Sequence, residues 1–317
     1  MNYKMTDYDI KRCFQESCKH IIPVIFIDDY WDYYMKLFNL ESKYELFKEQ
    51  YKSAGFQNCM DFKRNWQQIV NDVVERLQGN QPKDNNHKQI REFASNIRHG
   101  WKVDLLHTCP DGKYAKIDIH SAWDVVLKTV GVWNNEYNST MDIINDVSKY
   151  DIFKNQKLLR MNSYDKTLFE VLNDCHQISA QYLLKKIRES QHPIIQKLNA
   201  TYKTVIHTSG DMYMYKVDEF CGDDIEGDYE IDGIPFNISL YNAKTIFILG
   251  QKIKVIKKMN DDVIDYNIGY MKSGNLYPEL FPLALSLYND RTPNKYDLAI
   301  GCEDQIYFYL NENDYGK

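Results

Sequence analysis

The sequence of 317 residues lacks any run of about 18 consecutive apolar residues, the length that a membrane-spanning helix needs. Glycine (14) and proline (8) are scarce, which argues against a β-sandwich rich in turns. The 44% of hydrophobic residues suffices for a folded core, so extensive disorder is excluded. We expect no membrane span, no signal or transit peptide at the polar start of the chain, and a location in the cytoplasm.

Paired cysteines and several common catalytic motifs are also missing. The seven cysteines are odd in number, widely spaced and without a CxxC pair, so we expect reduced thiols, with neither a disulfide framework nor a structural zinc site. The patterns GxxxxGK[ST], GxGxxG, HExxH and GxSxG do not occur. Their absence disfavours P-loop, dinucleotide-binding, zinc-protease and serine-hydrolase chemistry.

A basic footprint of the kind that nucleic-acid binders usually show is absent as well. Lys plus Arg is 39 and Asp plus Glu is 45, a net charge of −6. Residues 201–317 contain 11 basic and 19 acidic residues (−8), which leaves 28 against 26 (+2) for residues 1–200. Any site for a polyanion must therefore be local, or must use metal ions to offset phosphate charge. The bias toward Asn, Lys and Ile indicates an AT-rich coding sequence, as in a phage or virus.

The pattern of apolar residues predicts helices first and strands later. Residues 8–100 are predicted to be mostly helical, with one helix marked by apolar residues at three- and four-residue spacing from Phe62 to Leu77. We predict further helices at 89–98, 121–130, 157–189 and 280–288, and strands at 101–105, 114–119, 202–206, 212–217, 245–256, 263–270 and 305–310. The stretch 78–88 is the expected linker. This order predicts an α+β fold with a largely antiparallel sheet.

Two acids stand where chemistry is expected. Asp118 ends the apolar strand and is followed by Ser121, the aromatic Trp123 and a helix. About 90 residues later, Asp211 occupies the tight turn between two short strand-like runs, and a long helix lies between the two acids. Acids from two neighbouring strands can hold two divalent cations about 4 Å apart, the arrangement that phosphoryl transfer needs.

This layout resembles the palm domain of template-dependent nucleic-acid polymerases, particularly reverse transcriptases. The segment around Asp118 resembles their motif A, the hairpin around Asp211 resembles motif C, and the intervening helix falls where motif B belongs. Met212 follows Asp211, where these families carry a second acid. The resemblance covers residues 101–218 and implies a palm-like sheet with packed helices there, a helical accessory region at 1–100 and a C-terminal α+β lobe at 219–317.

The resemblance also implies a set of site residues. Asp118, Asp211 and the backbone carbonyl of Ile119 would bind two Mg²⁺ or Mn²⁺ ions, which prefer such oxygen ligands. Trp123 would lie near the sugar of the incoming nucleotide. The triphosphate would be met by three cations near the start of the long helix: Lys154, Lys157 and Arg160. The implied activity is that of a metal-dependent nucleotidyltransferase, most simply a nucleic-acid polymerase, acting on nucleoside triphosphates and nucleic acid.

Other interpretations of the same residues stay open. If neither acid is catalytic, Asp118 would cap a helix and Asp211 would only stabilise the turn in which it lies. His120 and His207 would join the acids as ligands in a metal-dependent nuclease. A non-enzymatic viral or phage interaction protein is the third interpretation, because 14% aromatic residues suit protein-binding surfaces.

Several acids elsewhere are expected to be structural or simply solvated. We expect Asp28 or Asp29 to cap a helix and Asp124 to lie on the surface. The acidic group in the segment 223–228 lacks the spacing of a calcium loop and is expected to be a solvated loop: Asp223, Asp224, Glu226 and Asp228.

Overall fold

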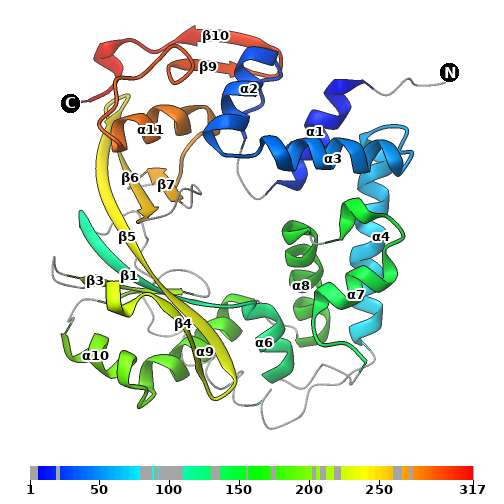
Figure 1. The fold of residues 1–317 in the computed structure, drawn as a ribbon, viewed down its shortest axis with the longest axis vertical. Coiled ribbons are helices and arrows are strands. Elements are labelled where there is room, and N and C mark those ends of the chain that lie inside the picture. The colour runs from blue at the N-terminus through cyan, green and yellow to red at the C-terminus, as the bar shows by residue number, and fades with distance from the viewer. Residues whose placement is uncertain are drawn as a thin grey trace. The chain divides into compact units, whose positions relative to one another are not determined.

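The computed structural model describes residues 6–18, 22–78, 88, 92, 110–129, 136–154, 156–172, 176–201, 205–207, 212–217, 223–259, 266–270 and 274–316 (Figure 1). Helices dominate the first part and an antiparallel sheet the second, so the expected α+β fold is confirmed. The expected helix at 89–98 and strand at 101–105 lie outside the described residues, apart from residue 92. No helix in the described ranges is long and apolar enough to cross a membrane.

The contacts divide the chain into two units, each built from separate stretches of sequence. The helical unit comprises Met1–His20, Ser42–Trp101 and Ser121–Lys185, and the sheet unit comprises Ile21–Glu41, Lys102–His120 and Lys186–Lys317. A unit defined by contacts is not the same as a domain that folds by itself. The three-part division at residues 100 and 218 therefore stays a prediction.

The helical unit is held together by aromatic side chains. Its elements are α1 (Asp7–Ser17), α3 (Glu41–Ser53), α4 (Cys59–Gln78), α6 (Ala122–Thr129), α7 (Thr140–Val147), α8 (Lys157–Leu172) and most of α9 (His176–Glu189). The ring centroid of Phe47 lies 5.3 Å from that of Phe14 and 5.8 Å from that of Phe62. Phe62 in turn lies 5.1 Å from Phe153. These contacts join α1, α3 and α4 to the short 3-10 turn Asp151–Phe153, and edge-to-face pairs of this kind add to the burial energy.

One buried acid links three helices of this unit. Asp124 of α6 is only 6% exposed, and it accepts hydrogen bonds from the Tyr164 hydroxyl of α8 and from the backbone N–H of Thr140 at 2.9 Å. Burial, together with the charge of Asp124, raises the pKa of Tyr164. The expected surface position of Asp124 is therefore wrong, because the packing of α7 and α8 encloses this side of α6 and supplies the donors that a buried carboxylate needs.

The sheet unit contains two antiparallel sheets. The large sheet has the order β2-β3-β1-β5-β6-β7-β8, with β4 also paired to β5, and the small sheet joins β9 and β10. Its strands are β1 (Gly112–Ile119), β2 (Val205–His207), β3 (Met212–Val217), β4 (Gly227–Ile231), β5 (Ile234–Ile248), β6 (Gln251–Lys258), β7 (Tyr266–Tyr270), β8 (Gly274–Asn275), β9 (Ala299–Cys302) and β10 (Gln305–Tyr309). Figure 1 shows β5 as the longest strand, curving through the sheet.

Two tight turns shape the middle of this sheet. Asp232 and Gly233 connect β4 to β5, and Leu249 and Gly250 connect β5 to β6, with positive φ at all four residues. Two successive residues with positive φ are the mark of the type I′ turn that suits two-residue hairpins. The expected single strand at 245–256 is therefore wrong, because the chain reverses at Leu249-Gly250 and the stretch contributes to both β5 and β6.

The two faces of the large sheet differ in character. Because side chains alternate along a strand, buried apolar residues of β1 and β5 share one face, here called the Phe236 face: Ala115, Ile117, Ile119, Phe236, Ile238 and Leu240. Helix α10 (Pro193–Thr201) covers this face, since the Tyr215 hydroxyl of β3 donates to Asn199 Oδ1 at 2.9 Å. The opposite face, here called the Asp118 face, carries the polar residues described below around Asp118. Farther along the strands it carries a buried cluster: Tyr114, Met214, Tyr241, Ala243 and Ile256.

Helix α2 corrects a further expectation, whereas the helices α9, α10 and α11 (Phe281–Tyr288) agree with the sequence. Helix α2 spans Asp28–Leu37, and its N-cap is Ile27, so Asp28 and Asp29 lie in the first turn and do not cap. Helix α9 ends at Glu189, as the sequence predicts, and Pro193 begins α10, because proline is well tolerated in the first turn of a helix. Helix α11 and β10 lie where the sequence predicts them.

A buried lysine ties β1 to the hairpin of β5 and β6. The Lys254 side chain is 1% exposed, and its ammonium contacts the carboxylate of Asp111 and, at 2.6 Å, the Thr245 hydroxyl. Burial pushes the pKa of Asp111 upward, but hydrogen bonds from Lys254 and Thr245 outweigh it, so this pKa lies below its ordinary value of 3.8. The ion pair therefore stabilises the fold at pH values at which Asp111 is ionised.

Replacing Tyr164 by Phe removes a donor from the buried Asp124. We expect Tyr164→Phe to lower the free energy of unfolding by about 1–3 kcal/mol, since the carboxylate stays buried with fewer hydrogen bonds. Urea unfolding monitored by tryptophan fluorescence measures this change. Tyr315→Phe is the control, because the Tyr315 hydroxyl makes no hydrogen bond to a described residue. Equal stability of both variants would contradict the structural role of Asp124.

The contribution of Lys254 should depend on pH. Because the folded-state pKa of Asp111 is depressed, its stabilisation is present above pH 3.8 and is lost as the pH falls through the folded-state value. We expect Lys254→Met to cost about 1 kcal/mol at pH 7, a modest figure because Asp111 is half exposed, and progressively less below pH 4. Unfolding curves from pH 3 to pH 7 test this, with Lys252→Met on the same strand as control. A cost that is independent of pH would refute the ion pair.

Candidate functional site

The Asp118 face carries a row of oxygen-bearing side chains across three strands. The Cα of Asp118 on β1 is paired with that of Asn237 on β5, and Asn237 is paired in turn with Asp228 on β4. Directly opposed residues in an antiparallel sheet point to the same face, with Cα atoms about 4.5–5.5 Å apart. Asp118, Asn237 and Asp228 therefore form one polar row, here called the acid row.

Asp118 is paired with a lysine but remains open to solvent. Lys116 lies two residues earlier on the same face of β1, and its Nζ is 2.9 Å from the Asp118 carboxylate. The same ammonium lies 5.2 Å from the ring centroid of Tyr241. The Asp118 side chain is 33% exposed, so a ligand can reach it. Among the described residues no backbone N–H of α6 donates to Asp118, which argues against its being a helix cap.

His120 belongs to the same face but contacts a different acid. Its Nε2 lies 2.8 Å from Asp228 Oδ1, and both side chains are largely exposed. Asp228 was expected in a solvated loop and lies instead on strand β4, because the type I′ turn after it folds the acidic segment back against β5. The Cα of His207 pairs with Tyr213, which pairs with Ile117, so His207 does not share the row of Asp118.

The second predicted acid, Asp211, lies outside the described residues, and the strands that flank it are described. Strands β2 and β3 pair antiparallel, as the sequence predicts for a hairpin. Strand β3 is the neighbour of β1 and begins at Met212, whose Cα partner on β1 is Asp118. Asp211 is thus the residue immediately before the cross-strand partner of Asp118 in the sequence.

The acid row offers hard oxygen donors to a cation. Asp118 supplies a carboxylate and Asn237 supplies an amide oxygen. The Nδ2 of Asn237 donates to the Ser239 hydroxyl at 3.4 Å. Mg²⁺ and Mn²⁺ prefer such ligands and keep water for the remaining positions. Within the described part of the chain, no cluster of three or more His, Cys, Asp or Glu side chains is arranged to hold a metal ion. Ile119 pairs with Phe236, and a role for its carbonyl stays a prediction.

The predicted nucleotide-binding residues belong to the helical unit. Trp123 stacks on Tyr164, with ring centroids 5.5 Å apart and an interplanar angle of 22°. Arg160 of α8 is half-buried, and its Nε has no hydrogen-bond partner among the described residues. Lys154 forms an ion pair of 2.7 Å with Asp151. Lys154 and Lys157 line the same pocket, which does not include Arg160 or Trp123.

Sequence reasoning found Asp118 but missed Asn237 and Asp228. A local signal for Asn237 exists, because Asn237 and Ser239 alternate with the apolar residues Phe236, Ile238 and Leu240, which marks a strand with one polar face. No local signal places that strand beside β1, since pairing between segments more than 100 residues apart depends on the whole sheet.

Comparison of the chain with protein-family models, with curated proteins and with solved structures gave no match.

The exposure of Asp118 predicts that it contributes little to stability. We expect Asp118→Asn to lower the free energy of unfolding by about 1 kcal/mol or less, as for a partly exposed ion pair. Its neighbour Ile117 is fully buried on the Phe236 face, so Ile117→Ala should cost about 2–4 kcal/mol. Chemical denaturation of both variants checks the assignment of faces. A loss in Asp118→Asn as large as that in Ile117→Ala would show that the acid is structural.

Proposed function

We propose that the protein is a metal-dependent nucleotidyltransferase of the palm type, most simply a nucleic-acid polymerase that uses two divalent ions. The observation that carries the proposal is the register between β1 and β3. The strand that begins directly after Asp211 lies beside β1, and its first residue, Met212, is the cross-strand partner of Asp118. Asp211, 93 positions after Asp118 in the sequence, directly precedes the residue that pairs with Asp118.

Two carboxylates close enough to share divalent ions would suit the transfer of a nucleotide. Divalent ions held by them would activate the 3′-hydroxyl and offset the charge that develops on the triphosphate. The covered Phe236 face gives β1 a rigid support, because Ile117 and Ile119 are buried on that face on either side of Asp118. Rigid support matters because catalytic ligands must be held in place within a fraction of an ångström.

Lys116 has a defined part in this proposal. Its ammonium neutralises Asp118, and a divalent ion would compete with it for the same carboxylate. A lysine on a flexible stem can move away without disturbing the strand. Trp123, Lys154, Lys157 and Arg160 would contact the nucleotide, and nucleic acid would be the second substrate.

Extension of a labelled primer on a template tests the activity. With Mg²⁺ or Mn²⁺, we expect wild-type protein to lengthen the primer and both Asp118→Asn and Asp211→Asn to be at least about 100-fold slower, since each removes charge from the ion site. Asp304→Asn, in the turn between β9 and β10, makes the same charge change outside the acid row and should retain full activity. Full activity in both acid variants would exclude the proposal.

Two other outcomes identify the alternatives. A labelled oligonucleotide that shortens in the presence of metal, with loss in Asp118→Asn, indicates the nuclease. No reaction, together with no rise in melting temperature at millimolar Mn²⁺, indicates the interaction protein, because an ion that binds the folded state must stabilise it.

A further inference from the structure

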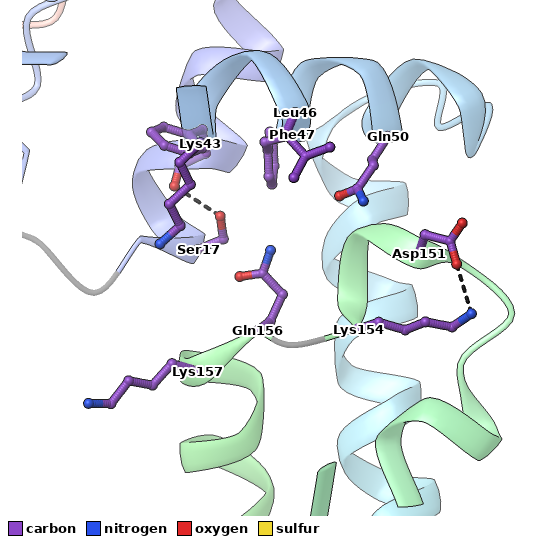
Figure 2. A pocket seen from close by; sticks show the side chains of 10 residues that line it. Ser17, Lys43, Leu46, Phe47, Gln50, Asp151, Lys154, Gln156 and Lys157 are labelled. Atoms are coloured by element: carbon purple, nitrogen blue, oxygen red, sulfur yellow. Dashed lines mark hydrogen bonds and ion pairs between the residues drawn. The ribbon is translucent and has the colours of Figure 1, made fainter. Parts of the chain in front are cut away.

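The helical unit contains a pocket of its own. It has a volume of about 410 Å³, within the range of small-molecule sites. Helices α1 and α3 form part of its wall, and Asp151, Lys154, Gln156 and Lys157 form the rest (Figure 2). Its lining residues are Phe14, Ser17, Lys43, Leu46, Phe47, Gln50, Asp151, Lys154, Gln156 and Lys157.

The charge of this lining is positive. Three lysines and one acid line the pocket, a balance of +2, and the acid Asp151 is already paired with Lys154. Lys43 forms no ion pair with any described residue and is exposed. Figure 2 shows the Lys43 and Lys157 ammonium groups on the same side of the pocket, away from the pair of Lys154 and Asp151. This side is therefore suited to an anion.

Helix ends strengthen the same preference. Lys43 lies in the first turn of α3, and Lys157 is the first residue of α8. The first turn of a helix carries the positive end of its dipole and backbone N–H groups that favour phosphate. The C-terminal end of α1 also lines the pocket and carries the negative end of a helix dipole. There the Ser17 hydroxyl donates to the carbonyl of Phe14 at 2.9 Å. The positive charge of Lys43 and Lys157 exceeds the partial negative charge at the end of α1.

The remaining wall is apolar and carries two amides. Phe14 and Phe47 are buried, whereas the Leu46 side chain lines the pocket and is 54% exposed. Figure 2 shows Gln50 and Gln156 directed into the pocket from opposite sides. Gln156 Nε2 donates to the carbonyl of Ile152 at 2.9 Å, which leaves its oxygen as an acceptor. An apolar wall with a few amides suits a flat heterocycle with polar edges.

We propose that this pocket binds a nucleoside phosphate. Lys43 and Lys157 bind the phosphate groups, Leu46 and Phe47 contact the base, and Gln50 hydrogen-bonds to its edge. The inference shares Lys157 with the proposed function, which assigns this lysine to the nucleotide, but it does not depend on the acid row or on divalent metal. It assigns a nucleotide site to this chain whether or not the sheet unit catalyses nucleotide transfer.

Calorimetric titration of the full chain with ATP in EDTA tests this proposal, with adenosine and inorganic phosphate as partial probes. We expect ATP to bind more tightly than either probe. Lys43→Ala should weaken ATP binding about 10-fold or more, the usual loss for a charged hydrogen bond. Lys52→Ala is the matched control, because Lys52 lies on the same helix, is exposed and does not line the pocket.

The outcomes separate this site from the acid row. Asp118→Asn should leave ATP affinity in EDTA unchanged, whereas Leu46→Asp, which places an acid in the apolar wall, should reduce it. Three results would overturn the proposal: no heat with ATP at millimolar concentration, equal losses in Lys43→Ala and Lys52→Ala, or binding of inorganic phosphate as tight as that of ATP. Loss of ATP binding in Asp118→Asn would show that the pocket does not bind ATP independently of the sheet unit.

Discussion

The register of β1 between β3 and β5 is the constraint on which the arrangement of the sheet unit depends. With Ile117 and Ile119 buried on the Phe236 face, Asp118 must lie on the other face, opposite Asn237 and Met212. A slip of one residue would bury the carboxylate and expose two isoleucines, which costs several kcal/mol in lost burial and desolvation. The apolar face thus fixes the position of the polar one.

The two units differ in electrostatics, and this difference explains a feature of the sequence. Two members of the acid row, Asp228 and Asn237, belong to the acidic residues 201–317. Asp118 and the lysine-lined pocket belong to the first 200 residues, where basic and acidic residues nearly balance. A chain with net charge −6 has no general attraction for phosphate. Local collections of charge at helix starts, or cations held by carboxylates, are two ways in which such a chain could bind phosphates, and we propose one of them for each unit.

Local patterns in the sequence predicted the elements well and their partners poorly. Helix α4 and strand β1 follow from apolar periodicity, and Asp118 stands out because it ends an apolar strand. The break between β5 and β6 was missed because Leu249 takes a positive φ, which no residue-type preference predicts for leucine. The acid row and the pocket bring together residues about 100 positions apart, such as Lys43 with Lys157, so only tertiary packing reveals them.

The most direct test of the central claim is the position of bound manganese. Crystals grown with Mn²⁺ should give an anomalous diffraction peak within about 2.0–2.6 Å of a carboxylate oxygen of Asp118, with Asp211 as a second ligand and the Lys116 ammonium displaced. A structure in which Mn²⁺ is absent from Asp118, or in which Asp211 lies too far away to share an ion with it, would contradict the account.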